Sequence, residues 1–364
     1  MRVHVVDPSA YTPPYDRALC AALARAGVDV TLVTSRFGYG DVPPAEGYEV
    51  DERFYRFAPA RAGSSVRFAG KLAQHVPDML RYRRAARAAD IVHFQWLTVQ
   101  PLDVHLLPRE RPVVLTAHDV LPREPRPGQL KAQKRLYDRV DAIVVHSHAG
   151  RERLVVDLEI DPQKVHVIPH GAFTNYTELE EEWALPVELA AVEKPVVLFF
   201  GLIRPYKGLD TLLNAWRGIG DAELWVVGMP RMPIGDLRAA APPNVRWMNR
   251  FVSDAEIPAL FRRADLVVLP YTEIDQSGVL FTALAFGKPL LLSAVGGFPE
   301  VADLGAAELV APGDRAALHI ALRRLLDDPA RRERLAAGAS AAAAGLYDWD
   351  TIAADHLALY RALT

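Results

Sequence analysis

The sequence alternates between short apolar segments and longer segments of helical periodicity, and it begins this alternation twice. The apolar segments of the first series, predicted as strands, are 3–6, 28–33, 91–94, 113–116, 142–145 and 165–168. Those of the second series are 195–201, 224–228, 245–248, 266–271 and 289–293. Strands of this apolar character are typical of parallel sheets covered by helices on both faces. We therefore expect an α/β protein with two Rossmann-like, doubly wound domains.

The stretch that separates the two series, 172–193, is acidic and has little strand character, so we interpret it as the interdomain linker. A chain of 364 residues has the length expected for two domains. The predicted division is an N-terminal domain over 1–172 and a C-terminal domain over 173–347. We expect a final amphipathic helix over 348–364 to cross back onto the first domain.

The composition limits the classes of protein to which the chain can belong. Half of the residues are hydrophobic and 24% are charged, which is typical of a soluble globular protein. No apolar run approaches the ~20 residues of a membrane span. The single cysteine, Cys20, excludes an internal disulfide and lies in an apolar helical pattern, where we expect it to be buried. No long basic run suggests nucleic-acid binding. These features predict a cytoplasmic protein.

The segment 199–210 carries the strongest local signal. A predicted buried strand ends at Gly201, a loop with Arg204 and Lys207 follows, and a helix then begins. Backbone N–H groups at a helix N-terminus favour anions, and the two cations add charge and hydrogen-bond donors. A diphosphate fits this pattern, and a turn with solvated cations fits it equally well.

A second loop, 270–280, also follows a predicted strand. Ser277 is a suitable N-cap for a helix, and Ser277 and Gly278 can offer N–H groups to an anion or to sugar oxygens. Glu273 and Asp275 can bind sugar hydroxyls. Simple helix capping with hydrated carboxylates is the alternative interpretation.

Polar residues also end predicted strands elsewhere. His118 and Asp119 follow the strand 113–116, where the imidazole can bind or polarise a hydroxyl; a histidine with a purely structural role is the alternative. The segments 144–147, 167–171 and 294–301 are predicted as turns.

Several common catalytic patterns are absent from the sequence. It contains no His-Glu-x-x-His zinc motif, no Gly-x4-Gly-Lys-[Ser/Thr] phosphate loop and no Gly-x-Ser-x-Gly nucleophile elbow. The first strand is not followed by Gly-x-Gly-x-x-Gly, which argues against a nicotinamide dehydrogenase. We expect neither a metal nor a cofactor.

Taken together and in order, six segments resemble glycosyltransferase family 4, a retaining family with the GT-B fold. The segments are 167–171, 200–209, 224–228, 264–270, 278–289 and 295–301. The resemblance implies transfer of a sugar from a nucleotide-sugar donor, bound by the second domain, to an acceptor hydroxyl without a metal. It points to glycoconjugate, polysaccharide or natural-product synthesis, with a sugar, a lipid-linked sugar or a small molecule as the acceptor.

The resemblance also implies roles for individual residues. Arg204 and Lys207 would hold the donor diphosphate and, with His118, form the catalytic set. The implied donor-binding residues are Gly201, Arg204, Lys207, Gly228, Tyr271, Glu273, Asp275, Gln276, Ser277, Gly278 and Thr282. The implied acceptor-side residues are Tyr11, Tyr15, His118 and Asp119. No cofactor is implied, because the nucleotide sugar is a substrate.

The sequence departs from the family pattern in three respects. Leu202 stands where the family has an arginine, and Ile274 and Thr282 stand where it has a pair of glutamates. The segment 11–15, with two prolines, replaces a glycine-rich loop. Two alternatives therefore stay open: a catalytically degenerate GT-B binding or scaffold protein, and a sugar-nucleotide epimerase.

The segment 61–87 is strongly basic, with Asp78 as its only acid. Its cations are Arg61, Arg67, Lys71, Arg81, Arg83, Arg84 and Arg87. Its apolar residues at near-helical spacing are Phe68, Leu72, Val76, Met79 and Leu80, and we expect Pro77 to break or kink the helix. The pattern predicts either peripheral contact with acidic lipids at the inner face of the membrane or a solvated helix packed on the first domain.

Overall fold

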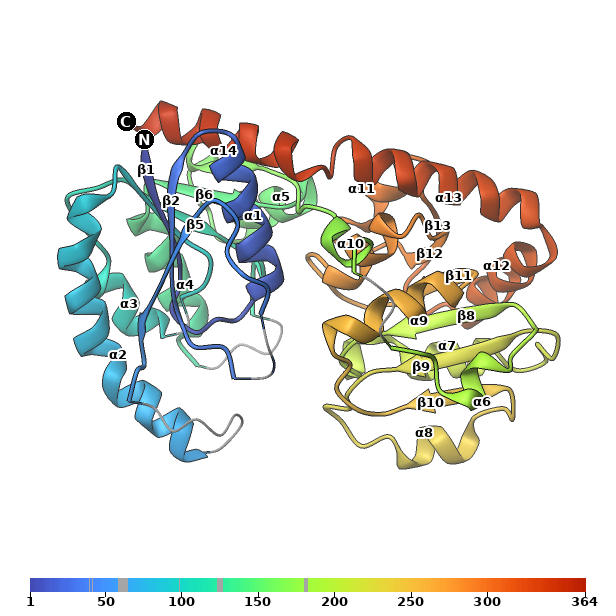
Figure 1. The fold of residues 1–364 in the computed structure, drawn as a ribbon. Helices are drawn as coiled ribbons and strands as arrows, with labels where there is room; N and C mark the ends of the chain where they lie inside the picture. Colours follow the sequence, from blue (N-terminus) through green and yellow to red (C-terminus); the bar gives the residue numbers. More distant parts are fainter. Residues whose placement is uncertain (39, 41, 58–64, 98, 123–126, 180–182) are drawn as a thin grey trace. The chain divides into compact units, whose positions relative to one another are not determined.

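The computed structural model describes residues 1–38, 40, 42–57, 65–97, 99–122, 127–179 and 183–364, and the chain forms two compact units (Figure 1). The first unit comprises Met1–Gly171 and Trp349–Thr364, and the second comprises Ala172–Asp348. Each unit contains one parallel sheet, and helices lie between most of its successive strands. The prediction of an α/β fold with two doubly wound sheets is confirmed.

The sheet of the first unit has the order β3-β2-β1-β4-β5-β6-β7. Its strands are β1 (Arg2–Asp7), β2 (Asp29–Ser35), β3 (Glu49–Phe54), β4 (Ile91–Phe94), β5 (Val113–Thr116), β6 (Ala142–Val145) and β7 (Val165–Val167). The helices of this unit are α1 (Pro13–Arg25), α2 (Ser65–Ala85), α3 (Gln100–Leu106), α4 (Gln129–Arg139), α5 (His148–Asp157) and α14 (Trp349–Leu363). Short 3-10 turns lie at η1 (Ala86–Ala88) and η2 (Pro162–Lys164). Because β4 to β6 are buried along their whole length, the core runs through the middle of this sheet.

The C-terminal helix α14 belongs to the first unit, where it packs against α1 (Figure 1). The Tyr360 hydroxyl lies 2.6 Å from Nδ1 of the buried His93 on β4, and Arg25 forms an ion pair with Asp350. Trp349, at the start of α14, lies so close to Gly171 that a Cβ there would overlap the indole ring. A glycine is therefore required where the chain leaves the first unit.

The sheet of the second unit has the order β10-β9-β8-β11-β12-β13. Its strands are β8 (Val196–Phe200), β9 (Glu223–Val227), β10 (Val245–Met248), β11 (Leu266–Leu269), β12 (Leu290–Ser293) and β13 (Ala307–Val310). The helices are α6 (Val187–Ala190), α7 (Leu209–Ala215), α8 (Gly235–Ala240), α9 (Ile257–Arg263), α10 (Gly278–Ala285), α11 (Phe298–Asp303), α12 (Arg315–Asp327) and α13 (Pro329–Ala344). The 3-10 turns are η3 (Thr174–Tyr176), η4 (Pro205–Lys207) and η5 (Asp254–Glu256).

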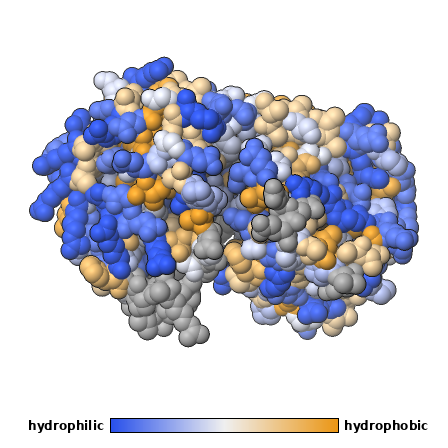
Figure 2. Space-filling model, in the orientation of Figure 1, coloured by the Kyte–Doolittle hydropathy of each residue, from blue (hydrophilic) through white to orange (hydrophobic). Residues whose placement is uncertain are grey.

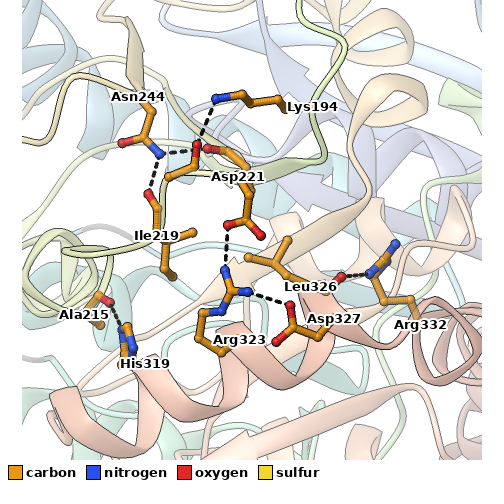
Figure 3. Close-up of polar contacts among 12 residues, drawn as sticks. Lys194, Ala215, Ile219, Asp221, Asn244, His319, Arg323, Leu326, Asp327 and Arg332 are labelled. Atoms are coloured by element: carbon orange, nitrogen blue, oxygen red, sulfur yellow. Dashed lines mark hydrogen bonds and ion pairs between the residues drawn. The ribbon is translucent and has the colours of Figure 1, made fainter.

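Polar contacts fasten α12 near the amino-terminal edge of the second sheet (Figure 3). Arg323 bridges Asp221, which precedes β9, and Asp327, which lies one helical turn further along α12. His319 donates from Nδ1 to the carbonyl oxygen of Ala215, at 2.7 Å. Asn244, which precedes β10, donates to the carbonyl oxygens of Ile219 and Ala222. These contacts leave the loops at the opposite, carboxyl-terminal edge available for other roles.

Two strands were missed from the sequence, and one helix continues where we expected a break. β3 was missed because its sequence, EVDERF, is charged and forms an edge strand. β13, AELV, was missed because Glu308 interrupts its apolar pattern and it also lies at a sheet edge. We expected a break or a kink at Pro77; α2 continues through Pro77, so the helix is not broken there. Pro77 is exposed, which lets solvent satisfy the carbonyl that it leaves unpaired, while Met79 and Tyr82 are buried in the core and hold the helix in place.

Cys20 is buried in α1, as expected. Among the described residues, no helix combines the length and the hydropathy needed to cross a bilayer.

We predict that Gly171→Ala destabilises the first unit by about 1–3 kcal/mol, because the new methyl group overpacks against Trp349. Chemical denaturation would measure this change. Gly235→Ala is the matched control, since a Cβ at Gly235 meets no atom within 4 Å. Equal free energies of unfolding for the two variants would contradict the proposed docking of α14.

Candidate functional site

The strand order of each sheet reverses direction at one point, between β1 and β4 in the first unit and between β8 and β11 in the second. In doubly wound sheets, ligands bind outside the carboxyl ends of the strands at such a point. Most of the residues singled out from the sequence follow strands at or next to these two points. The two groups are described separately, one in each unit.

In the second unit, glycines allow three loops to pack backbone against backbone. Gly201 follows β8 with φ +103°, and Gly228 follows β9 with φ +142°. A side chain at Gly228 would overlap the Gly201 carbonyl, and one at Gly208 would overlap the carbonyl of Pro270, after β11. Thr272 N–H also donates to the Tyr206 carbonyl at 2.8 Å. The loops after β8, β9 and β11 therefore form one continuous surface.

The two predicted phosphate-binding cations have different surroundings. Lys207 is 6% exposed, and its Nζ lies 4.8 Å from the centroid of the buried Tyr271 ring and beside Gly201. Arg204 is exposed at the start of η4. The fold thus fixes one cation in the loop and leaves the other able to move toward a ligand.

The loop after β11 contains both exposed and buried polar side chains. Glu273 is exposed, whereas Asp275 and Ser277 are buried. Ser277 occupies the N-cap position of α10, as predicted, but its side chain makes no capping hydrogen bond. Gly278 is exposed at the first turn of α10, and Gln276 is half-buried.

Thr282 stands where the family pattern has a glutamate, and it is buried. Its hydroxyl donates to the Gly278 carbonyl at 2.9 Å, one turn earlier in α10. The Thr282 hydroxyl proton is therefore engaged within the helix.

In the first unit, both ring nitrogens of His118 face protein groups. Nε2 lies 3.1 Å from Oε1 of Gln95, and Nδ1 lies 3.1 Å from Nε2 of His146. His146 in turn has Nδ1 at 3.0 Å from the Ile168 carbonyl oxygen. A substrate hydroxyl can reach a His118 nitrogen only by displacing one of these partners.

Aromatic rings hold the imidazole of His118 from several directions. Trp96 stacks on it with ring centroids 5.0 Å apart and an interplanar angle of 14°, and the buried Tyr15 meets it edge-on at 4.7 Å. The exposed Tyr11 packs on Trp96 at 4.4 Å. Tyr15 therefore supports the cluster from within, and Tyr11 lies at its surface.

A pocket of about 250 Å³ opens beside this cluster. Its lining includes Tyr11, Gln95, Trp96, His118 and Asp119. It brings together three of the four residues assigned to the acceptor side, while Tyr15 lies behind them.

Burial keeps the histidines of this cluster neutral. It lowers the pKa of His146 to about 4, and it lowers the pKa of His118 and His170 well below the usual value. The neighbouring histidines lower the pKa of His118 further. His118 is therefore suited to hydrogen bonding as a neutral imidazole at pH 7.

Several members of this cluster were not recognised from the sequence. His146 and His170 lay in segments expected to be simple turns, and Gln95 and Trp96 were not singled out. Each follows a strand of the first sheet, the same positional signal that drew attention to His118. Among the described residues, no group of three histidine, cysteine or acidic side chains is placed to hold a metal ion.

Comparison with known protein families gave two adjacent matches. The model for "Glycosyltransferase Family 4" matches residues 16–175, and the model for "Glycosyl transferases group 1" matches residues 194–328. A similar curated protein is a D-inositol 3-phosphate glycosyltransferase of Kineococcus radiotolerans, 28% identical over 388 residues, which span 94% of this chain and 88% of the relative.

Solved structures support the fold assignment. Sucrose-phosphate synthase from Thermosynechococcus elongatus superposes with a TM-score of 0.78 at 20% identity, covering 100% of this chain and 99% of that one. Anabaena Alr3699/HepE in complex with UDP-glucose superposes with a TM-score of 0.76 at 19% identity, covering 100% of both chains.

The buried histidines predict a loss of stability in mild acid. Their pKa values are lower in the folded state than the ordinary 6.5, so the unfolded chain binds more protons as the pH falls below about 6.5. Stability is therefore present above this pH and is lost progressively toward pH 4. Denaturation at pH 7.5 and pH 5.0 would measure the loss, which we expect to be smaller in His146→Gln. An equal loss in wild type and variant would contradict a neutral, buried His146.

Proposed function

Because this chain belongs to glycosyltransferase family 4 and has the GT-B fold, we propose that it transfers a sugar from a nucleotide-sugar donor to an acceptor hydroxyl with retention of configuration. The observation that carries the donor assignment is the buried Lys207 beside Gly201, with the exposed Arg204 in the same loop. An ammonium group held beside the loop backbone adds positive charge and hydrogen-bond donors, which suit a diphosphate.

The donor diphosphate, in this proposal, binds the surface formed by the loops after β8, β9 and β11. The close packing at Gly201, Gly208 and Gly228 allows a ligand to approach the backbone there. As the bond from the sugar to the diphosphate breaks, negative charge grows on the leaving group. Arg204 and Lys207 stabilise that charge, which lowers the barrier. A similar fold, Alr3699/HepE, was solved with UDP-glucose, so a UDP-sugar is a reasonable first donor to test.

The acceptor, in this proposal, uses the pocket beside His118. The pocket combines aromatic surface from Tyr11 and Trp96 with the polar side chains of Gln95 and Asp119. Such a lining suits a hydroxylated ring, whose apolar face and hydroxyls both need partners. A sugar, a lipid-linked sugar and a small polyol all meet this description.

A binding or scaffold role remains the second candidate. It is favoured by Thr282, whose hydroxyl proton is engaged within α10 where the family pattern has a glutamate. Turnover of a nucleotide sugar separates the two functions.

We predict that Arg204→Ala and Lys207→Met each weaken donor binding by about 10- to 100-fold, because each removes a charge-assisted hydrogen bond worth about 1.5–3 kcal/mol. Methionine fills most of the space of the Lys207 stem and preserves packing against Tyr271. Thermal stabilisation by a panel of nucleotide sugars, followed by calorimetric titration of the best one, would measure the effect. Arg217→Ala, an exposed cation beyond the end of α7, is the control. Wild-type affinity in both site variants would refute the diphosphate assignment.

The reaction is predicted to be independent of divalent metal. No Asp-x-Asp motif follows a predicted strand, and Arg204 and Lys207 supply positive charge to the leaving group. Full activity should therefore persist in EDTA. Activity that disappears in EDTA and returns with Mg²⁺ or Mn²⁺ would show that this is wrong.

We also propose that the outer face of α2 contacts anionic lipid. Val76 and Met79 of the apolar stripe pack into the core of the first unit, but Leu72 and Leu80 are 47% and 46% exposed. Figure 2 shows hydrophilic and hydrophobic residues interspersed along this side of the molecule. Beside α2 lies a pocket of about 260 Å³ whose charged lining residues are Arg83, Arg84, Arg87, Arg109, Glu110 and Arg111.

Five guanidinium groups and one carboxylate around this pocket favour phosphate headgroups, at roughly 1 kcal/mol for each cation near the surface. We predict co-sedimentation with phosphatidylglycerol vesicles and not with phosphatidylcholine vesicles at low salt. Arg84→Glu combined with Arg109→Glu should abolish it, and Arg217→Glu should not. An absence of wild-type binding to both vesicle types would remove the membrane proposal.

A further inference from the structure

A chain of hydrogen bonds crosses the carboxyl-terminal edge of the first sheet. It connects Gln95 after β4, His118 after β5, His146 after β6 and the carbonyl of Ile168 after β7. Successive heavy atoms are 3.1, 3.1 and 3.0 Å apart. Each histidine uses both of its ring nitrogens, so the position of every hydrogen in the chain depends on its neighbours.

The Ile168 end of the chain fixes the first hydrogen. A carbonyl oxygen only accepts, so Nδ1 of His146 carries a hydrogen and donates it to Ile168. His146 is buried, which lowers its pKa to about 4, so the ring is neutral at pH 7 and its Nε2 carries no hydrogen. That bare nitrogen faces Nδ1 of His118, which must therefore be the donor.

The hydrogen at the Gln95 end of the chain is fixed in the same way. His118 is also neutral at pH 7, because burial and the neighbouring histidines lower its pKa. With its hydrogen on Nδ1, its Nε2 is a bare acceptor facing Gln95. A half-turn of the Gln95 amide puts the NH₂ group on this nitrogen. The half-turn also gives a partner to that buried NH₂, which otherwise has none among the described residues.

We propose that His146 is a positioning residue, which holds His118 in the Nδ1–H tautomer and so makes His118 Nε2 an acceptor for a substrate hydroxyl. The hydroxyl takes the place of the Gln95 amide, which lines the same pocket. The tautomer assignment stands on the hydrogen bonds and on the neutrality of the two rings, and the role for a hydroxyl rests on the proposed glycosyl transfer.

The environment of His118 prevents the ring from escaping this arrangement by rotation. Trp96 lies parallel to one face of the ring and Tyr15 meets it edge-on. Trp96 is itself fastened by a hydrogen bond of 2.9 Å from its Nε1 to the Thr12 hydroxyl. The ring therefore keeps its orientation, and the tautomer decides what each nitrogen can do.

The tautomer can be measured in the free protein. In ¹⁵N-histidine-labelled protein at pH 7.5, two-bond ¹H–¹⁵N correlations identify which ring nitrogen carries the hydrogen, and the loss of signals in His118→Gln assigns His118. We expect the Nδ1–H form in wild type. His146→Gln should preserve it, because a glutamine amide can donate to Ile168 and accept from His118. His146→Leu should convert His118 to the Nε2–H form, which can donate to Gln95 Oε1.

An Nε2–H form in the wild type, or an unchanged tautomer in His146→Leu, would overturn the positioning role. The wild-type spectrum decides the first point even if a variant does not fold.

Release of UDP from UDP-glucose in the presence of a sugar or polyol acceptor tests the functional consequence. We expect His146→Leu to be slower than wild type by about tenfold or more, because the substrate hydroxyl loses its acceptor. His146→Gln should stay within about threefold. Equal rates in wild type and His146→Leu would overturn the link to substrate. No release by wild type would count against the proposed use of this donor, and the tautomer result would stand independently of it.

Discussion

Every strand pair in the described part of both sheets is parallel, and this constraint determines where a ligand can bind. Parallel strands place all their carboxyl ends on one edge, so the loops that leave that edge lie next to one another. In the second unit this collects the loops with Gly201, Gly228 and Tyr271. In the first it collects Tyr11, Gln95, His118, His146 and His170. The opposite edge of the second sheet carries the fastening contacts of Arg323 and Asn244 instead (Figure 3).

The carboxyl-terminal edges of the two sheets are stabilised by different interactions. In the second unit, glycines at positive φ let backbones touch, and the ammonium group of Lys207 is buried among them. In the first unit, large aromatic rings and neutral histidines pack around His118. A charged, backbone-lined surface suits a diphosphate, and an aromatic surface with neutral hydrogen-bonding groups suits a hydroxylated acceptor.

The fold class could be predicted because the central strands are β-branched and apolar, and the strands 91–94, 113–116, 142–145 and 245–248 were predicted with their observed bounds. β3 could not be recognised, since a charged edge strand lacks this signal. The continuity of α2 at Pro77 could not be predicted, because proline chemistry opposes a helix whereas the burial of Met79 and Tyr82 favours one. Tertiary burial of this kind cannot be inferred from local sequence.

Part of the candidate site could likewise be predicted from the sequence, and part could not. Glycines and cations directly after strands were visible in the sequence, and the resemblance to a family gave them roles that still await a test. The contact of His118 with His146 was not visible, because the two residues are far apart in sequence and meet only when β5 and β6 pair. The engagement of the Thr282 hydroxyl with Gly278 depends likewise on a side-chain rotamer that no motif encodes.

The central claim is that this chain turns over a nucleotide sugar and does not merely bind one. The most direct measurement is the release of nucleoside diphosphate from a panel of UDP-, GDP- and dTDP-sugars, with and without simple sugar and polyol acceptors. The account predicts slow release from at least one donor alone, faster release with an acceptor, and a product of retained anomeric configuration. Saturable binding of a donor with no release under any condition would contradict it and favour a scaffold.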